Sequence, residues 1–565
     1  MINNIKKIFS SYNLDGYLVP KNDDYFTEYS KISYLKLVTN FSGSAGFALI
    51  LKKTNYLFVD GRYTLQAKKQ SGKKFKIKEI PYIWPKNILN KLIKKLNIGF
   101  NPKLFTNINL DKYFENSCNL ISINEDIFKK GKKDNFSINN NFFLLNKDIV
   151  GENSKSKISR LTKLLKKKKI NYLFVSAGEN ACWLLNIRGK DLPNSPIANC
   201  KLIISDEKKI YFFSPLHKVI KIRKKIKNIK ISYHKEEDFF EVLNTLNNGT
   251  FCIDSHTCSV LNEELIKSKF NIIFKKDPIY NFKSIKNKKE IKHMQDAHIK
   301  DGVALTRFLY WIKKQKINKL TEIYIEKKLE NFRKKSKNYL YPSFNTIAGS
   351  GPNGAIIHYR SSKKSNRKLN KNDLLLVDSG GQYKWGTTDV TRTICFSNVS
   401  QKIKEVFTRV LKGHIAMVLT NIEKKKTGHN IDKIARKSLN SVGLDYRHGT
   451  GHGVGFFLNV HEGPQSISKN NKVELKEGMI VSNEPGFYRE NKFGIRIENL
   501  VFIKKNKKNL IFENLTFAPI DKDLIDFNML KSYEKNYLFN YHLETYKKIS
   551  PYLKKNEKKW LAKSI

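Results

Sequence analysis

Cysteine is scarce in this sequence, and its six cysteines are scattered along 565 residues without a CxxC pair. A chain of this length can bury a sizeable core by itself, so it does not need a disulfide framework. We therefore expect reduced, mostly buried thiols. The sequence also lacks a GxSxG motif, which argues against a serine nucleophile on an α/β-hydrolase turn. The missing CxxC pair argues against a dithiol redox site in the same way.

Long apolar runs are absent as well. No run approaches the roughly 18 residues that a membrane-spanning helix needs. The N-terminal segment contains neither the apolar stretch nor the small-residue cleavage site of a signal peptide. We therefore expect a cytoplasmic protein with no membrane partner.

Acidic residues are few in comparison with basic ones. The chain has 51 Asp and Glu against 106 Lys and Arg, which gives a formal net charge of +55. Such a charge can attract a polyanion, for example nucleic acid. Lysine is nevertheless spread along the whole chain, and no RNA- or DNA-binding signature accompanies it. We interpret the charge as a compositional bias and expect no specific nucleic-acid partner.

Two N-terminal segments share one order of predicted elements. In the first, a strand at residues 16–20 is followed by a helix at 23–30 and by strands at 46–51 and 55–60. In the second, the strand NYLFVS at 171–176 is followed by the helical stretch NACWLLNIRG and by the strands CKLIIS and KIYFFS. Strands that alternate with helices at this spacing predict α/β units. The repeated order indicates an internal duplication.

The second half of the chain has longer helices and glycine-rich loops. A 3.6-residue periodicity predicts a long amphipathic helix from Glu290 and a second helix at Thr321–Lys335, with Thr321 as its N-cap. Further helices are expected at about Ser400–Asn421 and Asn430–Val442, and again near the C-terminus. The predicted organisation has two α/β domains, one α+β domain with the candidate site and a helical C-terminal extension, at residues 1–150, 151–285, 286–520 and 521–565.

Four carboxylates stand in two pairs in the third of these parts. Asp378 ends the apolar strand LLLVD, and Asp389 opens the next strand after the glycine-containing connection SGGQYKWGTT. Glu484 ends the strand MIVSNE, and Glu498 lies on the alternating strand 493–503 after a second reversal. Two hairpins can bring these acids together. Taken singly, each would be interpreted as a turn residue or a solvent-facing acid, but the joint pattern favours a shared site.

His452 lies in HGTGHGVG, where glycines let the backbone approach a ligand closely. Four acids in one site would repel one another strongly unless cations held them together. Oxygen ligands with one imidazole suit a pair of divalent metals, and paired metals activate water for hydrolysis. Asp378, Asp389, His452, Glu484 and Glu498 are therefore the predicted metal ligands.

Other histidines and one arginine accompany this pattern. His358, His448 and His461 lie close to the ligand motifs in sequence and could move protons or bind a carbonyl. Arg496 shares a strand face with Glu498 and could orient a ligand carboxylate. Three other histidines of this half have no such context and are predicted to be structural: His298, His414 and His429.

These motifs resemble a known family. GPNGAIIHY, LLLVDSGGQYKWGTTDVTRT, LDYRHGTGHGVGFFLNVHEGP, MIVSNEPGFY and FGIRIEN together resemble the pita-bread metallopeptidases, and within these the three-domain form of the Xaa-Pro aminopeptidase (aminopeptidase P) family. LDGYLVP and TNFSGSAGFALI are similar to the first domain of that family, and ACWLLNIRG to the start of its second. The resemblance implies an α/β fold with two creatinase-like N-terminal domains followed by a pita-bread α+β catalytic domain.

The resemblance also implies an activity. Members remove the N-terminal residue from peptides with proline in the second position, and they are typically dimeric. Two Mn²⁺ or related ions would be bridged by Asp389 and Glu498, with Asp378 completing one site and His452 and Glu484 the other. A hydroxide between the metals would attack the carbonyl, and Glu484 would accept a proton. The three histidines expected to bind substrate and shuttle protons are His358, His448 and His461.

Two alternatives remain at this point. One is a prolidase or another peptidase on the same core, although the two additional N-terminal domains favour the aminopeptidase. The other, from a different class, is a basic interaction protein of the same fold that binds nucleic acid. The complete set of five ligand residues counts against it.

Overall fold

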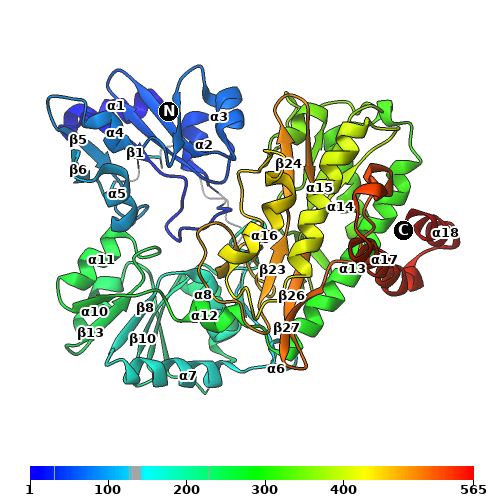
Figure 1. Cartoon of the computed structure of the whole chain (residues 1–565). Helices are drawn as coiled ribbons and strands as arrows, with labels where there is room; N and C mark the ends of the chain where they lie inside the picture. The colour runs from blue at the N-terminus through cyan, green and yellow to red at the C-terminus, as the bar shows by residue number, and fades with distance from the viewer. Residues whose placement is uncertain (31, 126, 129–140, 227) are drawn as a thin grey trace. The chain divides into compact units, whose positions relative to one another are not determined.

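A computed structural model describes the chain at residues 1–565 except 31, 126, 129–140 and 227 (Figure 1). Its internal contacts divide it into two compact units, Met1–Tyr280 and Asn281–Ile565. Among the described residues, no helix combines the length and the hydropathy that crossing a bilayer requires.

The first unit contains two six-stranded mixed sheets with helices on their faces (Figure 1). The first sheet has the order β4-β3-β2-β1-β5-β6 and the second has the order β12-β11-β10-β8-β13-β14. The strands of the first are β1 (Gly16–Val19), β2 (Phe47–Leu51), β3 (Asn55–Asp60), β4 (Lys76–Ile80), β5 (Leu96–Phe100) and β6 (Cys118–Ser122). Those of the second are β8 (Tyr172–Val175), β10 (Lys201–Ser205), β11 (Ile210–Phe213), β12 (Ile231–His234), β13 (Thr250–Ile253) and β14 (Asn271–Phe274).

The two sheets have the same topology. In each, the first strand pairs antiparallel with the second and parallel with the fifth, as the register Gly16↔Leu51 and Gly16↔Ile98 shows for the first sheet. The accompanying helices include α1 (Ile2–Ser11), α2 (Tyr34–Thr39), α3 (Thr64–Ser71), α5 (Asn107–Phe114), α7 (Ser154–Lys167), α8 (Gly178–Leu185), α9 (Leu216–Arg223), α10 (Phe239–Thr245) and α11 (Val260–Lys267). The predicted α/β fold class with a duplicated N-terminal topology is thereby confirmed.

The helix predicted at residues 23–30 is wrong. The Asp23 carboxylate accepts hydrogen bonds from the backbone N–H of Tyr25 (3.2 Å) and of Thr27 (2.9 Å) and from the Thr27 hydroxyl (2.6 Å). A side chain that binds nearby backbone N–H groups in this way competes with helix formation. The helix between the first two strands is instead α2, which begins after the N-cap Ser33.

The second unit is built from six α-helices and thirteen strands among its described residues, all of Asn281–Ile565. The helices are α13 (Lys288–Lys313), α14 (Glu322–Arg333), α15 (Gln401–Val418), α16 (Gly428–Asn440), α17 (Ser532–Ile549) and α18 (Lys555–Ser564). Helix α13 begins with a capping box between Asn287 and Glu290, and the predicted N-cap Thr321 of α14 accepts from the N–H of Tyr324. The expected long helices of this region are thus present.

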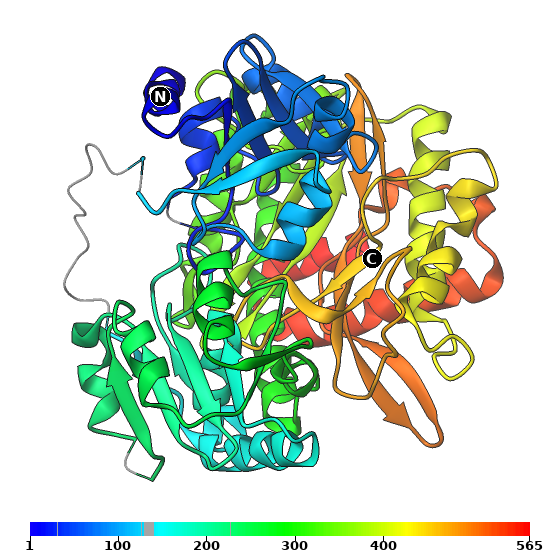
Figure 2. The same cartoon turned by 90° about the vertical axis from the view of Figure 1, so that its left-hand side faces the viewer.

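Two hairpins of the same design form the centre of this unit. Strand β17 (Leu375–Ser379) pairs antiparallel with β20 (Val390–Ile394), and the short strands β18 (Gly381–Tyr383) and β19 (Gly386–Thr387) form the tip. Strand β23 (Ile480–Asn483) likewise pairs with β26 (Asn499–Asn506), and β24 (Gly486–Arg489) and β25 (Phe493–Arg496) form the tip. Further strands are β15 (Tyr339–Pro342), β16 (Ile347–Ser350), β21 (Gly451–Gly453), β22 (Glu462–Ile467) and β27 (Asn509–Asn514). Figure 2 shows the β26–β27 hairpin extending from the body of the unit.

The single strand predicted at residues 493–503 is interrupted in the structure. Strand β25 ends at Arg496 and β26 begins at Asn499. At this break the chain changes its partner from β24 to β23, and the Glu498 N–H donates to Thr391 O (3.2 Å). The interruption therefore joins the second hairpin to the first and turns Glu498 toward it.

Each hairpin is covered by its own pair of helices. Apolar residues of α13 and α14 pack on Val377 of β17 and Val390 of β20. Apolar residues of α15 and α16 pack on Val481 of β23 and Val501 of β26. Burying these strand faces removes apolar area from water at about 25 cal/mol per Å². This packing fixes the strands whose ends carry the candidate site.

A buried ion pair ties α13 and α14 to the first hairpin. Arg333 donates to Asp301 through Nε (2.7 Å) and Nη2 (3.2 Å), and also to Ser379 Oγ (3.0 Å). The Tyr383 hydroxyl donates to the same Asp301 carboxylate (2.7 Å). Burial opposes the charge of Asp301, but Arg333 outweighs that effect and lowers the pKa of Asp301. Ser379 directly follows Asp378, so this network supports the strand end at the site.

We expect Arg333→Met to destabilise the second unit by about 3–5 kcal/mol, because it leaves Asp301 buried without its counter-charge. The midpoint of chemical unfolding measures the loss. Lys334→Met, at the C-cap of the same helix, removes an exposed pair with Glu330 and should change stability by less than about 1 kcal/mol. Equal effects of the two substitutions would contradict the importance of the buried pair.

Candidate metal centre

The structure brings all five predicted ligand residues to the ends of the paired hairpins. Asp378 lies on β17 opposite Thr391 of β20, and Asp389 immediately precedes β20. Glu484 follows β23, Glu498 precedes β26, and His452 lies at the middle of β21. The two hairpins are joined edge to edge by backbone and threonine hydrogen bonds, so residues more than a hundred positions apart become neighbours.

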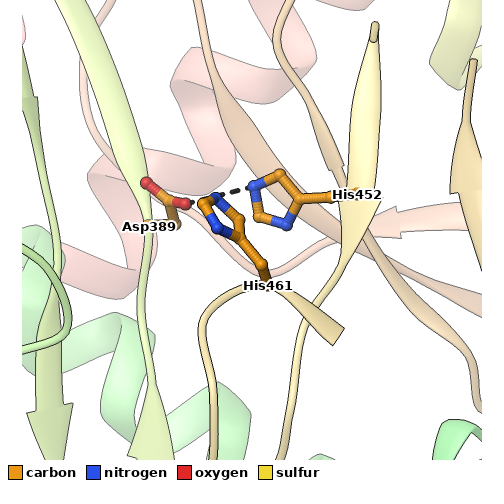
Figure 3. A group of neighbouring side chains, drawn as sticks. All are labelled: Asp389, His452 and His461. Carbon is orange, nitrogen blue, oxygen red and sulfur yellow. Dashed lines mark ion pairs between the residues drawn. The ribbon is translucent and has the colours of Figure 1, made fainter. Parts of the chain in front are cut away.

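The ligand atoms form overlapping clusters. Asp378, Asp389 and Glu498 place one oxygen each within 4.8 Å of one another, and so do ligand atoms of His452, Glu484 and Glu498. Glu498 belongs to both clusters, as expected of a residue shared between two cations. A third cluster contains Asp389, His452 and His461 (Figure 3). The arrangement offers two adjacent coordination sites with shared ligands.

His452 connects the two hairpins electrostatically. Its Nε2 lies 3.4 Å from Asp389 Oδ2 (Figure 3). The same nitrogen lies 3.6 Å from Glu484 Oε1, while Nδ1 lies 3.0 Å from Gly453 O. Burial opposes charge on this imidazole, but the hydrogen bond with Asp389 and the charge of Glu484 outweigh it and raise the pKa of His452 to about 9. With Nδ1 donating to a carbonyl, Nε2 is directed at the carboxylates, where it can serve as a metal ligand.

Asp378, Glu484 and Glu498 resist ionisation in this environment. Burial, followed by repulsion from Asp389 and Glu484, raises the pKa of Asp378 to about 6 against the lowering effect of Arg496. Burial also raises the pKa of Glu484, and it raises that of Glu498 well above its ordinary value together with repulsion from the neighbouring acids. The protein's own positive groups therefore do not balance the charge that four ionised acids would create.

A pair of divalent cations fits this set of residues. Asp378 Oδ1 and Asp389 Oδ1 are buried and have no hydrogen-bond donor, which is costly for a carboxylate oxygen unless another partner is supplied. Carboxylate oxygens and one imidazole are ligands that Mn²⁺ and similar ions accept. The fit thus rests on donor chemistry, charge and the two unpartnered oxygens.

Hydrogen bonds from residues that are not themselves predicted ligands orient two of the acids. Arg496 donates through Nη2 to Asp378 Oδ2 (2.5 Å) and through Nε to Thr391 Oγ1 (3.1 Å). The Thr391 hydroxyl in turn donates to Glu498 Oε2 (2.8 Å), and Arg496 Nη1 donates to the Tyr488 hydroxyl (2.6 Å). One arginine is therefore connected to an acid of each hairpin.

The three predicted catalytic histidines occupy different positions. His448 has Nε2 2.9 Å from the Tyr488 hydroxyl and Nδ1 4.0 Å from Glu484 Oε2. The His461 ring lies 4.3 Å from the His452 ring, nearly perpendicular to it. His358 is half-buried in the loop after β16 and belongs to none of the ligand clusters. His448 and His461 thus lie beside the ligand residues.

Several supporting residues were missed by sequence reasoning. Arg392 is buried and donates to the backbone oxygens of Thr391 (2.8 Å) and Glu498 (2.7 Å), and it reaches the Tyr541 hydroxyl of α17 (2.9 Å). An arginine within the otherwise uncharged strand VTRTI was a signal that could have found it. Tyr488 is the last residue of the recognised motif MIVSNEPGFY, but its contact with His448 depends on the fold of the hairpin tip.

His414 and Asn483 hold each other through two hydrogen bonds. Asn483 Nδ2 donates to His414 O (2.9 Å), and His414 Nδ1 donates to Asn483 O (3.1 Å). Burial lowers the pKa of His414 to about 3, so the ring is neutral. His414 therefore has a structural role, as expected, and its contacts with Asn483 fix the backbone beside Glu484.

Family models match almost the whole chain. Residues 292–505 match the model of metallopeptidase family M24, and residues 508–565 match the C-terminal region of that family. Residues 1–128 and 135–290 each match a creatinase/prolidase N-terminal domain.

Similar proteins agree with these models. A "Probable Xaa-Pro aminopeptidase P" from Laccaria bicolor is 35% identical over 99% of this chain and 92% of its own length. The crystal structure of X-prolyl aminopeptidase from Caenorhabditis elegans, described as a cytosolic enzyme with a di-nuclear active site, has a TM-score of 0.92 at 29% identity and covers 100% of this chain and 98% of that one. A prolidase from Thermococcus sibiricus has a TM-score of 0.54 at 27% identity and covers 65% of this chain and 98% of its own. The chain therefore belongs to metallopeptidase family M24, in the form that carries two creatinase/prolidase N-terminal domains.

Proposed function

We propose that the protein is a Xaa-Pro aminopeptidase, a metal-dependent exopeptidase that releases the N-terminal residue from peptides with proline in the second position. One observation carries the proposal. Five ligand side chains from two joined hairpins and a glycine-rich strand converge in a chain whose full length aligns with proteins named for this activity.

Two divalent cations, for which we propose Mn²⁺, would be held by Asp378, Asp389, His452, Glu484 and Glu498. When bound, they would supply Lewis acidity toward the scissile carbonyl and a water of lowered pKa. Amide hydrolysis at this site then requires no serine or cysteine nucleophile.

The protein's own groups have distinct proposed roles. Glu484 would accept a proton. Its Oε1 accepts a hydrogen bond from the Ser482 hydroxyl (3.1 Å), which orients the carboxylate, and its Oε2 faces His448. His448, His461 and His358 would bind the substrate carbonyl and move protons. The Tyr488 hydroxyl supports this role for His448 because it fixes the orientation of the ring. Arg496 would keep Asp378 ionised and oriented.

The proposed substrate explains the need for such a centre. Proline has no backbone N–H, and its ring restricts the peptide geometry, so the bond before it suits few general peptidases. We further propose that the protein works in the cytoplasm as a homodimer. The resemblance to the family supports both, and the Caenorhabditis elegans structure is that of a cytosolic enzyme.

A prolidase-type dipeptidase is the second candidate, because prolidases share the catalytic fold. The solved prolidase covers only 65% of this chain, whereas the Caenorhabditis elegans aminopeptidase covers all of it. This difference favours the aminopeptidase.

Substrate length separates the two candidates. We expect a peptide Xaa-Pro-Xaa to be cleaved at least roughly tenfold more efficiently than the dipeptide Xaa-Pro, a difference of about 1.4 kcal/mol in the transition state. Values of kcat/KM for matched substrates provide the measurement. A higher kcat/KM for the dipeptide would instead show that the protein is a prolidase-type dipeptidase.

Loss of a shared carboxylate should abolish turnover. With Mn²⁺ and an Arg-Pro-Pro peptide, we expect Asp389→Ala or Glu498→Ala to lower kcat/KM at least roughly 1000-fold, which corresponds to about 4 kcal/mol. Released arginine is measured by chromatography. Glu490→Ala, at an exposed position, should keep wild-type activity. Full turnover in either ligand variant would contradict the shared-ligand scheme.

Metal binding should reverse the effect of one substitution, Glu498→Gln, on the stability of the protein. Because burial and repulsion from neighbouring acids raise the pKa of Glu498, Glu498→Gln should stabilise the metal-free protein. The wild type should gain about 2.7 kcal/mol at Mn²⁺ a hundredfold above its Kd, and the variant should lose most of that gain. Thermal unfolding in EDTA and in Mn²⁺ measures both. An identical Mn²⁺ effect on the two proteins would contradict a ligand role for Glu498.

A further inference from the structure

Glu322 is a buried carboxylate that the proposed mechanism does not use. It is the first residue of α14, fully buried and outside the ligand clusters. Burial raises the pKa of Glu322, while hydrogen bonds from its neighbours oppose that shift. A buried carboxylate is stable only where hydrogen-bond donors surround it. The residues that supply these donors therefore show which part of the chain Glu322 fixes in place.

All of these donors belong to one loop. Glu322 Oε1 accepts from the N–H of Ser350 (2.8 Å) and from Asn353 Nδ2 (3.0 Å). Glu322 Oε2 accepts from the Tyr359 hydroxyl (2.7 Å) and from the N–H of Arg367 (2.9 Å). The Glu322 N–H donates to Arg367 O (3.1 Å). A single carboxylate therefore binds both ends of the loop and two side chains between them.

This loop carries His358, which precedes Tyr359. The backbone of the loop packs directly against β25, the strand that leads to Glu498. The approach is so close that a Cβ added to Gly494 of β25 would come within 1.9 Å of Gly354 O. Tyr359 also belongs to a buried apolar cluster against which Tyr488 packs. The Tyr488 hydroxyl in turn forms hydrogen bonds with His448 and Arg496. The loop is thus held between Glu322 on one side and residues of the metal centre on the other.

A second carboxylate of α14 reinforces the same contact. Glu326, one turn after Glu322, accepts from the Ser361 hydroxyl (2.6 Å). Glu330, a further turn along, is paired with Lys334 and takes no part in the loop contacts described here. The loop is therefore attached to the first turns of the helix, and Glu330 provides a matched position for comparison.

We propose that Glu322 is a positioning residue for the reaction, which places the His358 imidazole against the substrate by holding the Ser350–Arg367 loop. The inference rests on the proposed aminopeptidase function. Hydrogen bonds from N–H groups to a carboxylate are stronger than neutral ones. A catalytic group displaced by about 1 Å can lose roughly a hundredfold in rate.

Glutamine cannot replace this carboxylate. Ser350 N–H binds one oxygen and Arg367 N–H binds the other. An amide has a single oxygen, so its NH₂ group must face one of these two backbone donors. Glu322→Gln therefore keeps the volume and the helix but releases one end of the loop.

A double-mutant cycle tests the inference. With the Mn²⁺-loaded protein and an Arg-Pro-Pro peptide, Glu322→Gln should lower kcat/KM roughly 10- to 100-fold. His358→Asn alone should lower it roughly 100-fold or more. In the His358→Asn background, Glu322→Gln should cause almost no further loss, since it acts through that histidine. Glu330→Gln should match the wild type. Fully additive losses would overturn the proposal.

Two measurements that do not depend on activity complete the test. Glu322→Gln should accelerate amide hydrogen exchange in residues 350–367 while bound manganese per chain stays at the wild-type value. Unchanged exchange, or loss of manganese, would overturn a positioning role through the loop. Wild-type protein that binds manganese but releases no residue from Xaa-Pro peptides would instead refute the proposed function, and with it the role of Glu322 in that reaction. The two failures are therefore distinguishable.

Discussion

The catalytic unit depends on one electrostatic constraint: four carboxylates are gathered in a space where few positive groups of the protein reach them. Arg496 contacts Asp378, and His452 lies between Asp389 and Glu484, but two oxygens of the cluster remain buried without donors. Burial and mutual repulsion raise the pKa values of three of the acids. Such an arrangement is stable as a set of ionised groups only with cations bound, which links folding of this region to metal binding.

The fold gathers the four acids by using the same structural element, a helix-covered β-hairpin, twice. Two hairpins, β17–β20 and β23–β26, each present two acids, and each is covered by a pair of helices that buries its apolar face. The hairpins are joined where the strand leading to Glu498 changes partner. Rigid strands backed by packed helices can hold ligands more accurately than loops, and Arg496, Thr391 and Arg392 fix the remaining freedom of the acids.

The sequence was sufficient to predict the hairpins and which acids converge at their ends, because both are local patterns. An acid at the end of an apolar strand, a glycine-containing reversal and a second acid can be recognised over a few residues, as with Asp378 and Asp389. The prediction of a helix at residues 23–30 was wrong because the Asp23 side chain accepts hydrogen bonds from backbone N–H groups there. The contacts of Tyr488 with His448, and of Glu322 with the loop that carries His358, could not be predicted from sequence. They join segments that become neighbours only after folding, and no local periodicity records them.

The most direct test of the account is anomalous X-ray diffraction from crystals of the protein grown with Mn²⁺. We predict two manganese peaks about 3.5–4 Å apart, with Glu498 and Asp389 contacting both, Asp378 contacting one, and His452 and Glu484 contacting the other. A single peak, no peak, or peaks bound by other residues would contradict the account.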